Sequence, residues 1–389
     1  MIENADVSKE HHKIVHHHFD TSRGPLWAAR LLPYCREQES FINKIKLDLP
    51  EDEEFSFICH ILIAYHHSIT DGFTCDQLIM HLLNLLEDVI INKAIDVTEQ
   101  TSVLIQTEQE MDLINQIRSE FESKIRSFEE RKLSHEQTLA ECDLPKAYQV
   151  PVHNALETVC LNSSLDRKTT QLFLQKCKKE GITFNSGFTA ATDAAYVKLL
   201  RDKNVEKDSY KITALHCVNN RRAYFTGADK SYGNGMGVLD THVDTPKDVL
   251  DDFWYYSKKL HQQIKEQQKA MASYENYLIE QFTEKCVFEP ISLEDIKKDS
   301  LPKIVTYASS NMLDVTKTFT NLTRKNIRLD WYDRLSSLQL MNVLWMSDFQ
   351  TYHGQLMLSL QYNLGLMTSD TAQKLCDNIF EVIKQVVEE

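Results

Sequence analysis

The segment FSFICHILIAYHHSITDGFTCDQLIMHLLNLLEDVI, residues 55–90, decides the fold. Residues 55–65 are rich in β-branched and aromatic side chains, which predicts a largely buried strand. The stretch after the Asp-Gly pair has the apolar spacing of a helix, and Thr74 and Gln77 are spaced as a capping box at its start. The apolar positions of that helix are Leu78, Leu82, Leu85, Leu86 and Val89. The segment therefore predicts a strand, a short polar turn and a helix.

The polar turn holds the residue types that acid–base chemistry requires. His66 and His67 follow directly from the strand, and α/β folds place reactive groups at the ends of strands. Because a neutral imidazole accepts a proton near neutral pH, we predict that His67 is a general base toward an alcohol or amine that attacks a carbonyl. We expect Asp71 to hold the turn through an arginine or through backbone hydrogen bonds. Gly72 permits backbone geometry or a close approach that a Cβ would block.

The remainder of the chain divides into two parts around a charged stretch. Residues 98–154 are strongly charged and end in two X-Pro pairs, which indicates a connector. We therefore expect two halves, residues 1–150 and residues 151–389, in line with the domain number that this length favours. The second half is predicted to contain strands at 156–161 and 211–218, helices at 167–180, 186–202, 248–269 and 369–387, and a hairpin of 343–349 with 355–362.

Composition excludes several classes of protein. The chain has 43 basic and 57 acidic residues and a net charge of -14, which argues against broad attraction to nucleic acid or to an anionic membrane. Its nine cysteines include no C-x-x-C pair, which favours reduced thiols. No apolar run has the length of a membrane span, and no signal peptide is recognisable at the start. We expect a cytoplasmic protein.

The turn sequence HHSITDG resembles the HHxxxDG signature of the coenzyme A-dependent acyltransferase superfamily. This superfamily includes alcohol O-acetyltransferases, polyketide-associated acyltransferases and the condensation domains of peptide synthetases. The flanking segments are also similar to the family along nearly the whole chain. These segments are FDTSRGPLWAARLLP (residues 19–33), CKKEGITFNSGFTAATDAAYVKLL (residues 177–200), VNNRRAYF with YGNGMGVL (residues 218–239), and YHGQLMLSLQYN (residues 352–363).

The resemblance implies an α/β fold of two chloramphenicol-acetyltransferase-like domains, each a mixed sheet flanked by helices, with the active-site tunnel between them. It implies that His67 is the base, that Asp71 is structural, that His66 is supporting, and that Gly72 opens space for the thioester arm. Acyl-coenzyme A would be a co-substrate, with no permanently bound cofactor and no metal. The motif starts nearer the beginning of this chain than in relatives, so we expect a shortened first half. The DFGWG motif of the plant-type branch is absent, which disfavours that branch.

Other residues have more than one interpretation. Arg221, Arg222 and Lys230 could bind the phosphates of coenzyme A or could be structural. Asn219 and Asn234 could orient loops or bind substrate, or could be ordinary turn residues. The cluster His11, His12, His16, His17 and His18 suggests a metal site, but no acidic or cysteine partner is apparent, and a solvated start of a strand is the favoured interpretation.

Three functions remain open from the sequence. The first is an O- or N-acyltransferase, monomeric and acting on a small acceptor with acyl-coenzyme A. The second is a condensation-type enzyme that takes its acyl group from a carrier protein. The third is a non-catalytic binding relative of the fold.

Overall fold

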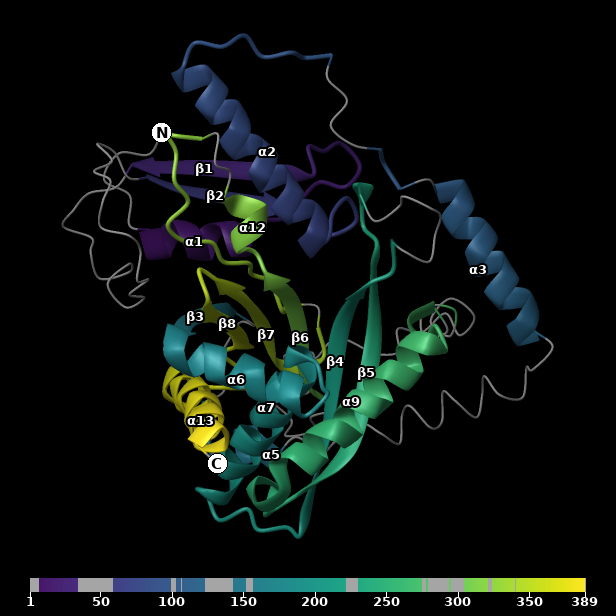
Figure 1. Ribbon diagram of the computed structural model, residues 1–389, viewed down its shortest axis with the longest axis vertical. Helices are drawn as coiled ribbons and strands as arrows, with labels where there is room; N and C mark the ends of the chain where they lie inside the picture. Colours follow the sequence, from purple (N-terminus) through teal and green to yellow (C-terminus); the bar gives the residue numbers. More distant parts are fainter. Residues whose placement is uncertain are drawn as a thin grey trace.

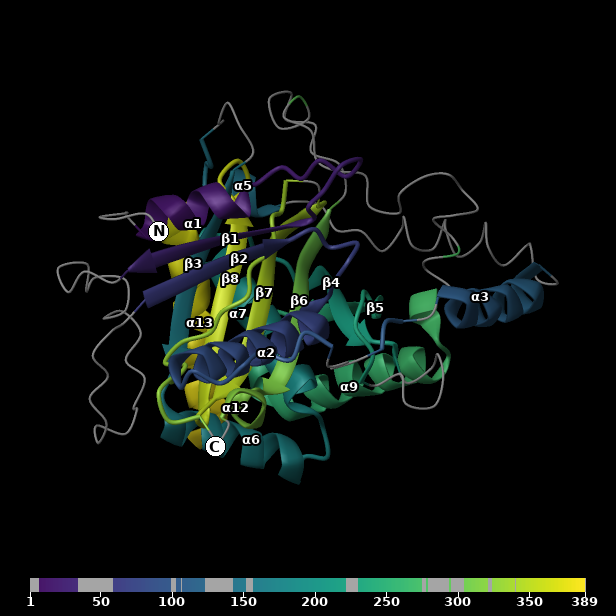
Figure 2. The same cartoon turned by 90° about the horizontal axis from the view of Figure 1, so that it is seen from above.

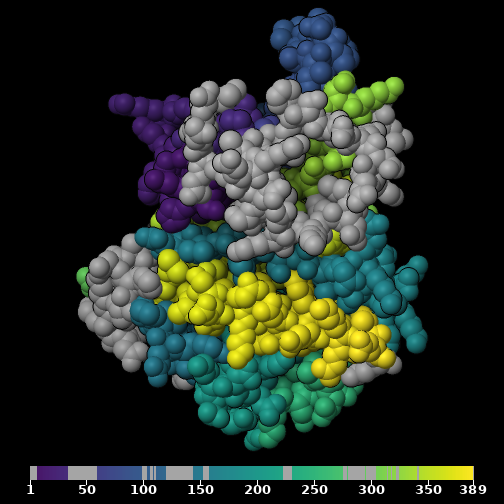
Figure 3. All heavy atoms as spheres, turned by 90° about the vertical axis from the view of Figure 1, so that its left-hand side faces the viewer, coloured from purple at the N-terminus to yellow at the C-terminus, as the bar shows by residue number. Residues whose placement is uncertain are grey.

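The N-terminal elements of residues 7–98 form one layer, and most of the elements after residue 157 form another (Figure 1). The computed structural model describes residues 7–33, 59–98, 103–105, 107–122, 143–151, 157–221, 230–274, 278, 294, 304–320, 324–339 and 341–388. In the space-filling view of Figure 3, residues of the N-terminal layer lie above the C-terminal helix. The functional turn belongs to the upper layer.

The N-terminal layer contains a two-stranded antiparallel sheet and two helices. Strand β1 (Trp27–Pro33) pairs with β2 (Cys59–Tyr65), with Trp27 opposite Tyr65. Helix α1 (Val7–Val15) contacts β2, and α2 (Gly72–Ile90) follows β2 after the short turn. This order confirms the predicted strand, turn and helix, although residues 55–58 lie outside the described part of the chain. The predicted burial of the strand is wrong, because every residue of β2 is exposed or half-buried in a sheet of only two strands.

The second layer is built on a six-stranded mixed sheet with the order β3-β8-β7-β6-β4-β5. The β4–β6 and β6–β7 pairs are parallel, and the other neighbours are antiparallel. The strands are β3 (Thr158–Leu165), β4 (Ser209–Asn219), β5 (Met236–Pro246), β6 (Val305–Asp314), β7 (Val343–Tyr352) and β8 (Gln355–Asn363).

Long helices cover one face of this sheet. They share the main hydrophobic core with the sheet, as the ring stack of Tyr307 on Trp345 at 5.0 Å illustrates. These helices are α6 (Arg167–Lys179), α7 (Phe184–Arg201), α9 (Phe253–Lys269) and α13 (Ser369–Glu388). The shorter or peripheral helices are α3 (Thr107–Glu122), α5 (Asp143–Ala147), η3 (Val249–Asp252) and α12 (Thr316–Phe319).

The other face of the sheet is turned toward the N-terminal layer (Figure 2). Every residue of β7 and β8 is buried, which is expected for central strands that are covered on both faces. Helix α2 also packs directly on the C-terminal half, because Leu83 contacts a cluster that includes Phe319 and Tyr332. The two halves of the sequence are therefore joined by apolar packing as well as by the polar contacts described below.

Most elements predicted for residues 151–389 are present with small boundary shifts. The predicted capping box of α2 is wrong. Asp71 is the N-cap, and its carboxylate accepts a hydrogen bond from the Thr74 N–H at 3.0 Å. The hydroxyl of Thr74 instead donates to the Gly233 carbonyl at 2.7 Å. A tertiary contact thus takes the hydroxyl that the local pattern assigned to the helix start.

The expected fold class is confirmed as mixed α/β, and the six-stranded sheet with flanking helices is its clearest part. The first half differs in detail from the mixed sheet that we expected for each domain. Its described residues contain a two-stranded antiparallel sheet with α1 and α2. Among the described residues, no helix is both long enough and apolar enough to cross a membrane.

Candidate active site

The turn HHSITDG is fixed at both ends by the elements that flank it. At the strand end, the His66 N–H donates to the Leu26 carbonyl at 2.9 Å, which continues the pairing of β1 with β2. At the helix end, Asp71 caps α2. Between them, the Ile69 N–H donates to the His66 carbonyl at 3.1 Å and closes a tight turn. The backbone that carries both histidines is therefore positioned by a strand and a helix.

Asp71 forms a buried bidentate ion pair with Arg221. Its Oδ2 and Oδ1 accept hydrogen bonds from Nη1 and Nη2 of Arg221 at 2.6 and 2.8 Å, and the side chains are 4% and 0% exposed. The Gly235 N–H also donates to Oδ2 at 2.9 Å. Two parallel bonds of this kind fix the relative orientation of the groups as well as their distance. Asp71 thereby holds the turn both through an arginine and through the backbone.

Arg221 has no role as an accessible substrate ligand, contrary to one of our two interpretations. Its Nε donates to the Ser231 carbonyl at 2.9 Å, and its Nη2 donates to Thr74 Oγ1 and the Gly233 carbonyl at 2.8 and 2.7 Å. The guanidinium also lies over the Phe73 ring, with Cζ 4.7 Å from the ring centre. All of these partners belong to the protein, so Arg221 is a structural residue. Arg222 lies outside the described residues.

The two predicted asparagines position loops. Asn219 Oδ1 accepts from the N–H of Arg221 at 3.0 Å and from its Nη1 at 3.2 Å. Asn234 Nδ2 donates to the His67 carbonyl at 3.0 Å, while its Oδ1 accepts from the Met236 N–H at 3.2 Å. Neither asparagine lines the cavity described next. Asn234 contributes to the site by holding the backbone of His67.

The histidines of the turn have different surroundings. His66 Nδ1 lies 2.8 Å from the hydroxyl oxygen of Ser68, with which it forms a hydrogen bond, and it also accepts a hydrogen bond from the backbone N–H of Ser68 at 3.3 Å. The His66 ring also meets the edge of Phe19, with ring centres 5.9 Å apart. Within the described part of the chain, the ring of His67 forms no hydrogen bond, and it is exposed to the cavity that it lines. Both rings line the cavity, but His66 has one ring nitrogen engaged by Ser68, whereas both nitrogens of His67 lack hydrogen bonds to the described residues.

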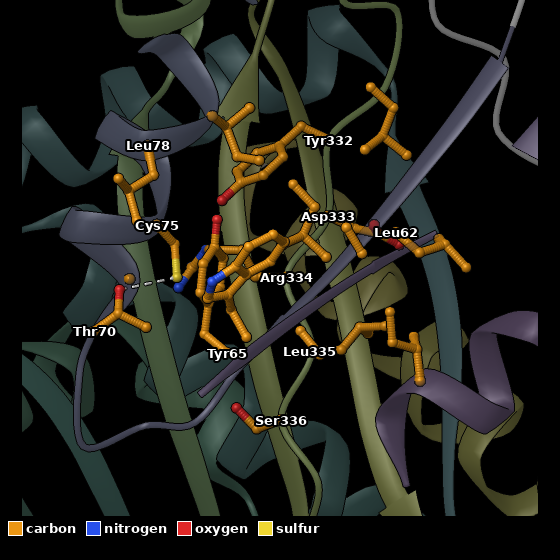
Figure 4. A pocket seen from close by; sticks show the side chains of 18 of the residues that line it. Leu62, Tyr65, Thr70, Cys75, Leu78, Tyr332, Asp333, Arg334, Leu335 and Ser336 are labelled. Carbon is orange, nitrogen blue, oxygen red and sulfur yellow. Dashed lines mark hydrogen bonds between the residues drawn. The ribbon is translucent and has the colours of Figure 1, made fainter. Parts of the chain in front are cut away.

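A cavity of about 2650 Å³ lies between the two layers. Its walls come from α1, β1, β2 and α2 on one side, and from β4, β6, β7 and residues 325–337 on the other. Figure 4 shows Thr70 and Cys75 facing Tyr332 and Arg334 across part of this space, with the Thr70 hydroxyl 3.4 Å from the Cys75 sulfur. The cavity is the expected space between halves, and His67 lines it.

A buried charged cluster, which the sequence analysis missed, forms part of the cavity wall. Arg334 Nη1 donates to Ser310 Oγ at 3.1 Å and lies 3.6 Å from Asp348 Oδ1. Nearby, the Tyr332 hydroxyl donates to Asp76 at 2.5 Å. Burial raises the pKa of Asp76 to about 6, although Arg334 and the Tyr332 hydrogen bond act in the opposite direction. Residues 324–339 have no regular secondary structure, so neither periodicity nor a local motif could have identified this cluster.

Gly72 is required by the position of Arg334. A Cβ built on Gly72 would lie 2.7 Å from Arg334 Nη1 and 3.1 Å from Met312 Sδ. The close approach expected at this glycine is therefore made by a side chain of the protein's own second half. We expected the space beside Gly72 to be open to a thioester arm. In the structure this space is occupied by the guanidinium of Arg334.

The histidine-rich N-terminus forms helix α1 and not the expected start of a strand. Helical spacing brings His12 and His16 together, with ring centres 4.3 Å apart. However, His16 Nε2 accepts a hydrogen bond from the Thr158 N–H at 3.1 Å, which uses the nitrogen that would bind a metal. The described residues contain no group of three or more histidine, cysteine, aspartate or glutamate side chains arranged to hold a metal ion.

Comparison with known proteins identifies the fold. No family model and no curated protein matches the chain. Among solved structures, TRI3 trichothecene 15-O-acetyltransferase from Fusarium sporotrichioides is similar with a TM-score of 0.62 at 13% identity, covering 93% of this chain and 71% of that one. The condensation domain of the monacolin K polyketide synthase MokA gives a TM-score of 0.60 at 12% identity, covering 100% of this chain and 79% of that one.

A third similar structure is the epimerization domain from the third module of tyrocidine synthetase B. It gives a TM-score of 0.53 at 12% identity and covers 85% of this chain and 69% of that one. Identities this low establish the fold alone. The chain has the fold shared by this epimerization domain, the MokA condensation domain and the TRI3 acetyltransferase.

Proposed function

We propose that this protein transfers an acyl group from acyl-coenzyme A to a hydroxyl or amine of a small acceptor, with His67 as the general base. The observation that carries the proposal is the position of His67. Its ring is free of hydrogen bonds to the described residues and lines the cavity between the layers. Its backbone carbonyl is held by Asn234 at 3.0 Å, and its turn is anchored by the Asp71–Arg221 pair.

The imidazole of His67 can take one proton from the acceptor and later return it to the leaving group. The neutral imidazole accepts the proton of the acceptor O–H or N–H while the oxygen or nitrogen attacks the thioester carbonyl. The carbon–sulfur bond then breaks, and the imidazolium returns the proton to the leaving thiolate. Because a thioester already carries a good leaving group, alignment of the two substrates in the cavity supplies much of the remaining rate enhancement.

The test is acyl transfer measured as release of free thiol. The protein is incubated with acetyl-, hexanoyl- and benzoyl-coenzyme A, each with and without a set of small alcohols and amines. His67→Ala should lower the rate with the best pair at least about 100-fold, the usual scale for loss of a general base. His12→Ala, a change at an exposed histidine on α1, is the matched control and should leave the rate unchanged. Turnover close to wild type in a folded His67→Ala variant would refute the role of His67.

A carrier-protein donor is the second candidate function. It is favoured by the similarity to the MokA condensation domain and to the tyrocidine synthetase epimerization domain, which are parts of a polyketide synthase and of tyrocidine synthetase B. The two donors are separated by offering the same acyl group on coenzyme A and on the phosphopantetheine arm of a purified carrier protein. A rate at least tenfold higher with the carrier-bound thioester would select this second function. If neither donor is consumed but an acyl-coenzyme A binds, the chain is a non-catalytic relative.

A further inference from the structure

Asp348 occupies a central position in the cavity wall. It lies on β7, where it pairs in register with Ser310 of the parallel neighbour β6. Both residues line the cavity that contains His67. The Asp348 side chain is 5% exposed, so its carboxylate is held in a site that is nearly closed to bulk water.

Only part of this carboxylate is satisfied by the protein. Oδ1 faces Arg334 Nη1 at 3.6 Å, which is longer than a hydrogen bond. Oδ2 is buried and has no hydrogen-bond partner among the described residues. A buried, unpaired carboxylate oxygen is costly, and such groups in folded proteins usually have a functional or solvent partner.

His67 supplies the complementary feature. Its ring has no hydrogen bond to any residue that the structure describes, and it lines the same cavity. The two groups are near enough to interact electrostatically. Burial raises the pKa of Asp348, whereas Arg334, a hydrogen bond from Ser310 and the nearby His67 lower it. The unpaired Oδ2 of Asp348 and the ring of His67, which has no hydrogen bond to the described residues, thus line the same cavity.

We propose that Asp348 is the positioning residue for His67, with Oδ2 accepting the imidazole N–H through one ordered water. This inference rests on the proposed function of His67. A base whose second nitrogen is held by a carboxylate keeps one tautomer and one ring orientation, and its protonated form is stabilised. The proton taken from the acceptor remains on His67 until the thiolate leaves and accepts it, so Asp348 itself does not change protonation.

The charged and titratable groups around Asp348 come from several elements. Those that change charge near pH 7 would contribute to the pH dependence of the rate. Arg334 compensates the carboxylate, and His67 faces it from the turn. The groups that also interact electrostatically with Asp348 are Asp333, Cys160 and Cys217. Because burial raises the pKa values of both thiols, these groups stay neutral near pH 7. Arg334 and Asp333 are therefore the other charges near this carboxylate in that range.

The first test is spectroscopic and requires no substrate. The ¹⁵N chemical shifts of the His67 imidazole, assigned by comparison with His67→Gln, distinguish the protonated from the unprotonated ring nitrogen. Wild-type protein above pH 8 should show one tautomer, whereas Asp348→Asn should show a mixture. The same substitution at exposed Asp314, at the end of β6, is the matched control and should preserve the single tautomer. A single, unchanged tautomer in a folded Asp348→Asn variant would overturn the proposal.

The second test is the pH dependence of acyl transfer, measured with acetyl-coenzyme A and the best acceptor from the thiol-release screen. Asp348→Asn should lower kcat at least about tenfold with little change in KM. It should also move the acid limb of the rate profile toward lower pH, because the carboxylate that favours the protonated imidazole is gone. Asp348→Glu, which keeps the charge, should restore much of the acid limb and provides a second variant if Asp348→Asn does not fold. Loss of activity in His67→Ala combined with a wild-type profile in Asp348→Asn would reject the positioning role and keep the base. Full activity in His67→Ala would reject the proposed function itself.

Discussion

Asp71 and Arg221 are 150 positions apart in the sequence, yet their side chains form two parallel hydrogen bonds of 2.6 and 2.8 Å in the interior. The pair joins the helix start of the N-terminal layer to the end of β4 in the second layer. The same carboxylate caps α2 and accepts from the Gly235 N–H. One aspartate thereby connects the turn that carries His67 to the large sheet.

Asp71→Asn tests how much this ion pair stabilises the folded protein. The amide keeps an oxygen that can cap α2, but it leaves the Arg221 charge buried without its counter-ion. Breaking a buried pair from one side costs about 3–5 kcal/mol, so we expect a loss of that size in the free energy of unfolding. Denaturant unfolding measures it. The exposed pair Lys247–Asp208 is the control, because solvent screens its charges and Asp208→Asn should cause little change in stability. An equal, small loss for both variants would show that the buried pair is not structurally important.

Gly72→Ala tests the contact between the motif and Arg334. The added Cβ would meet Nη1 at 2.7 Å, and this nitrogen is held by Ser310. Displacing it should cost about 1–3 kcal/mol, the usual range for overpacking a filled site. Shortening the arginine in the double variant Gly72→Ala/Arg334→Ala should remove most of the clash. The prediction fails if the two losses in stability simply add, because additivity would mean that the side chains do not compete for space.

The sequence was most informative where the structure is local. Periodicity predicted β2, the long helices α7 and α13 and the β7–β8 hairpin, because each follows from burial of one face or from turn chemistry. His353 and Gly354 do adopt the positive φ angles of a tight turn, at 49° and 78°. In contrast, the N-cap of α2 was misassigned, since Thr74 is engaged by a loop that lies far away in the sequence.

The parts of the candidate site that were missed are tertiary. Asp348 and Arg334 have no mutual spacing that a motif could encode, because they meet only when β7 packs beside a loop without regular structure. The same reason explains Arg221. An arginine beside a turn resembles a ligand for phosphate, and only the position of Asp71 shows that its donors are already used.

Asn234→Ala tests how strongly the loop after residue 230 positions the base. Loss of the amide removes the hydrogen bond to the His67 carbonyl at 3.0 Å and leaves the Asp71–Arg221 pair in place. We expect kcat for acyl transfer to fall about tenfold with KM nearly constant, because the ring is displaced from the geometry in which it takes the proton. The control is Asn185→Ala, in the first turn of α7, which should have no effect on kcat. Asn204, in the turn after α7, is unsuitable because its φ of 59° is one that alanine adopts only with strain.

The stability of the protein should depend on pH through Asp193. This carboxylate is buried in α7 and accepts hydrogen bonds from Tyr256 and Tyr307 at 2.7 and 2.8 Å. Burial raises its pKa from 3.8 to about 7, and the two tyrosine hydrogen bonds only partly oppose that shift. Because the folded state holds this proton more tightly than the unfolded state, the contribution of Asp193 to stability is complete below about pH 4. It decreases as pH rises toward 7.

We therefore expect Asp193 by itself to lower the free energy of unfolding by about 2–3 kcal/mol between pH 5 and pH 8. Asp76 and Asp348 act in the same direction, whereas His216, whose pKa burial lowers to about 4, acts in the opposite direction. Asp193→Asn removes the titrating group with little change of shape and should flatten most of this dependence in denaturant unfolding. Asp166→Asn provides the comparison. Because the pKa of exposed Asp166 is lowered, this carboxylate affects the free energy of unfolding only at pH values below this range. A wild-type slope in Asp193→Asn would mean that the proton is taken up elsewhere. The slope would then have to come from other buried carboxylates such as Asp76 and Asp348, whose pKa values burial also raises.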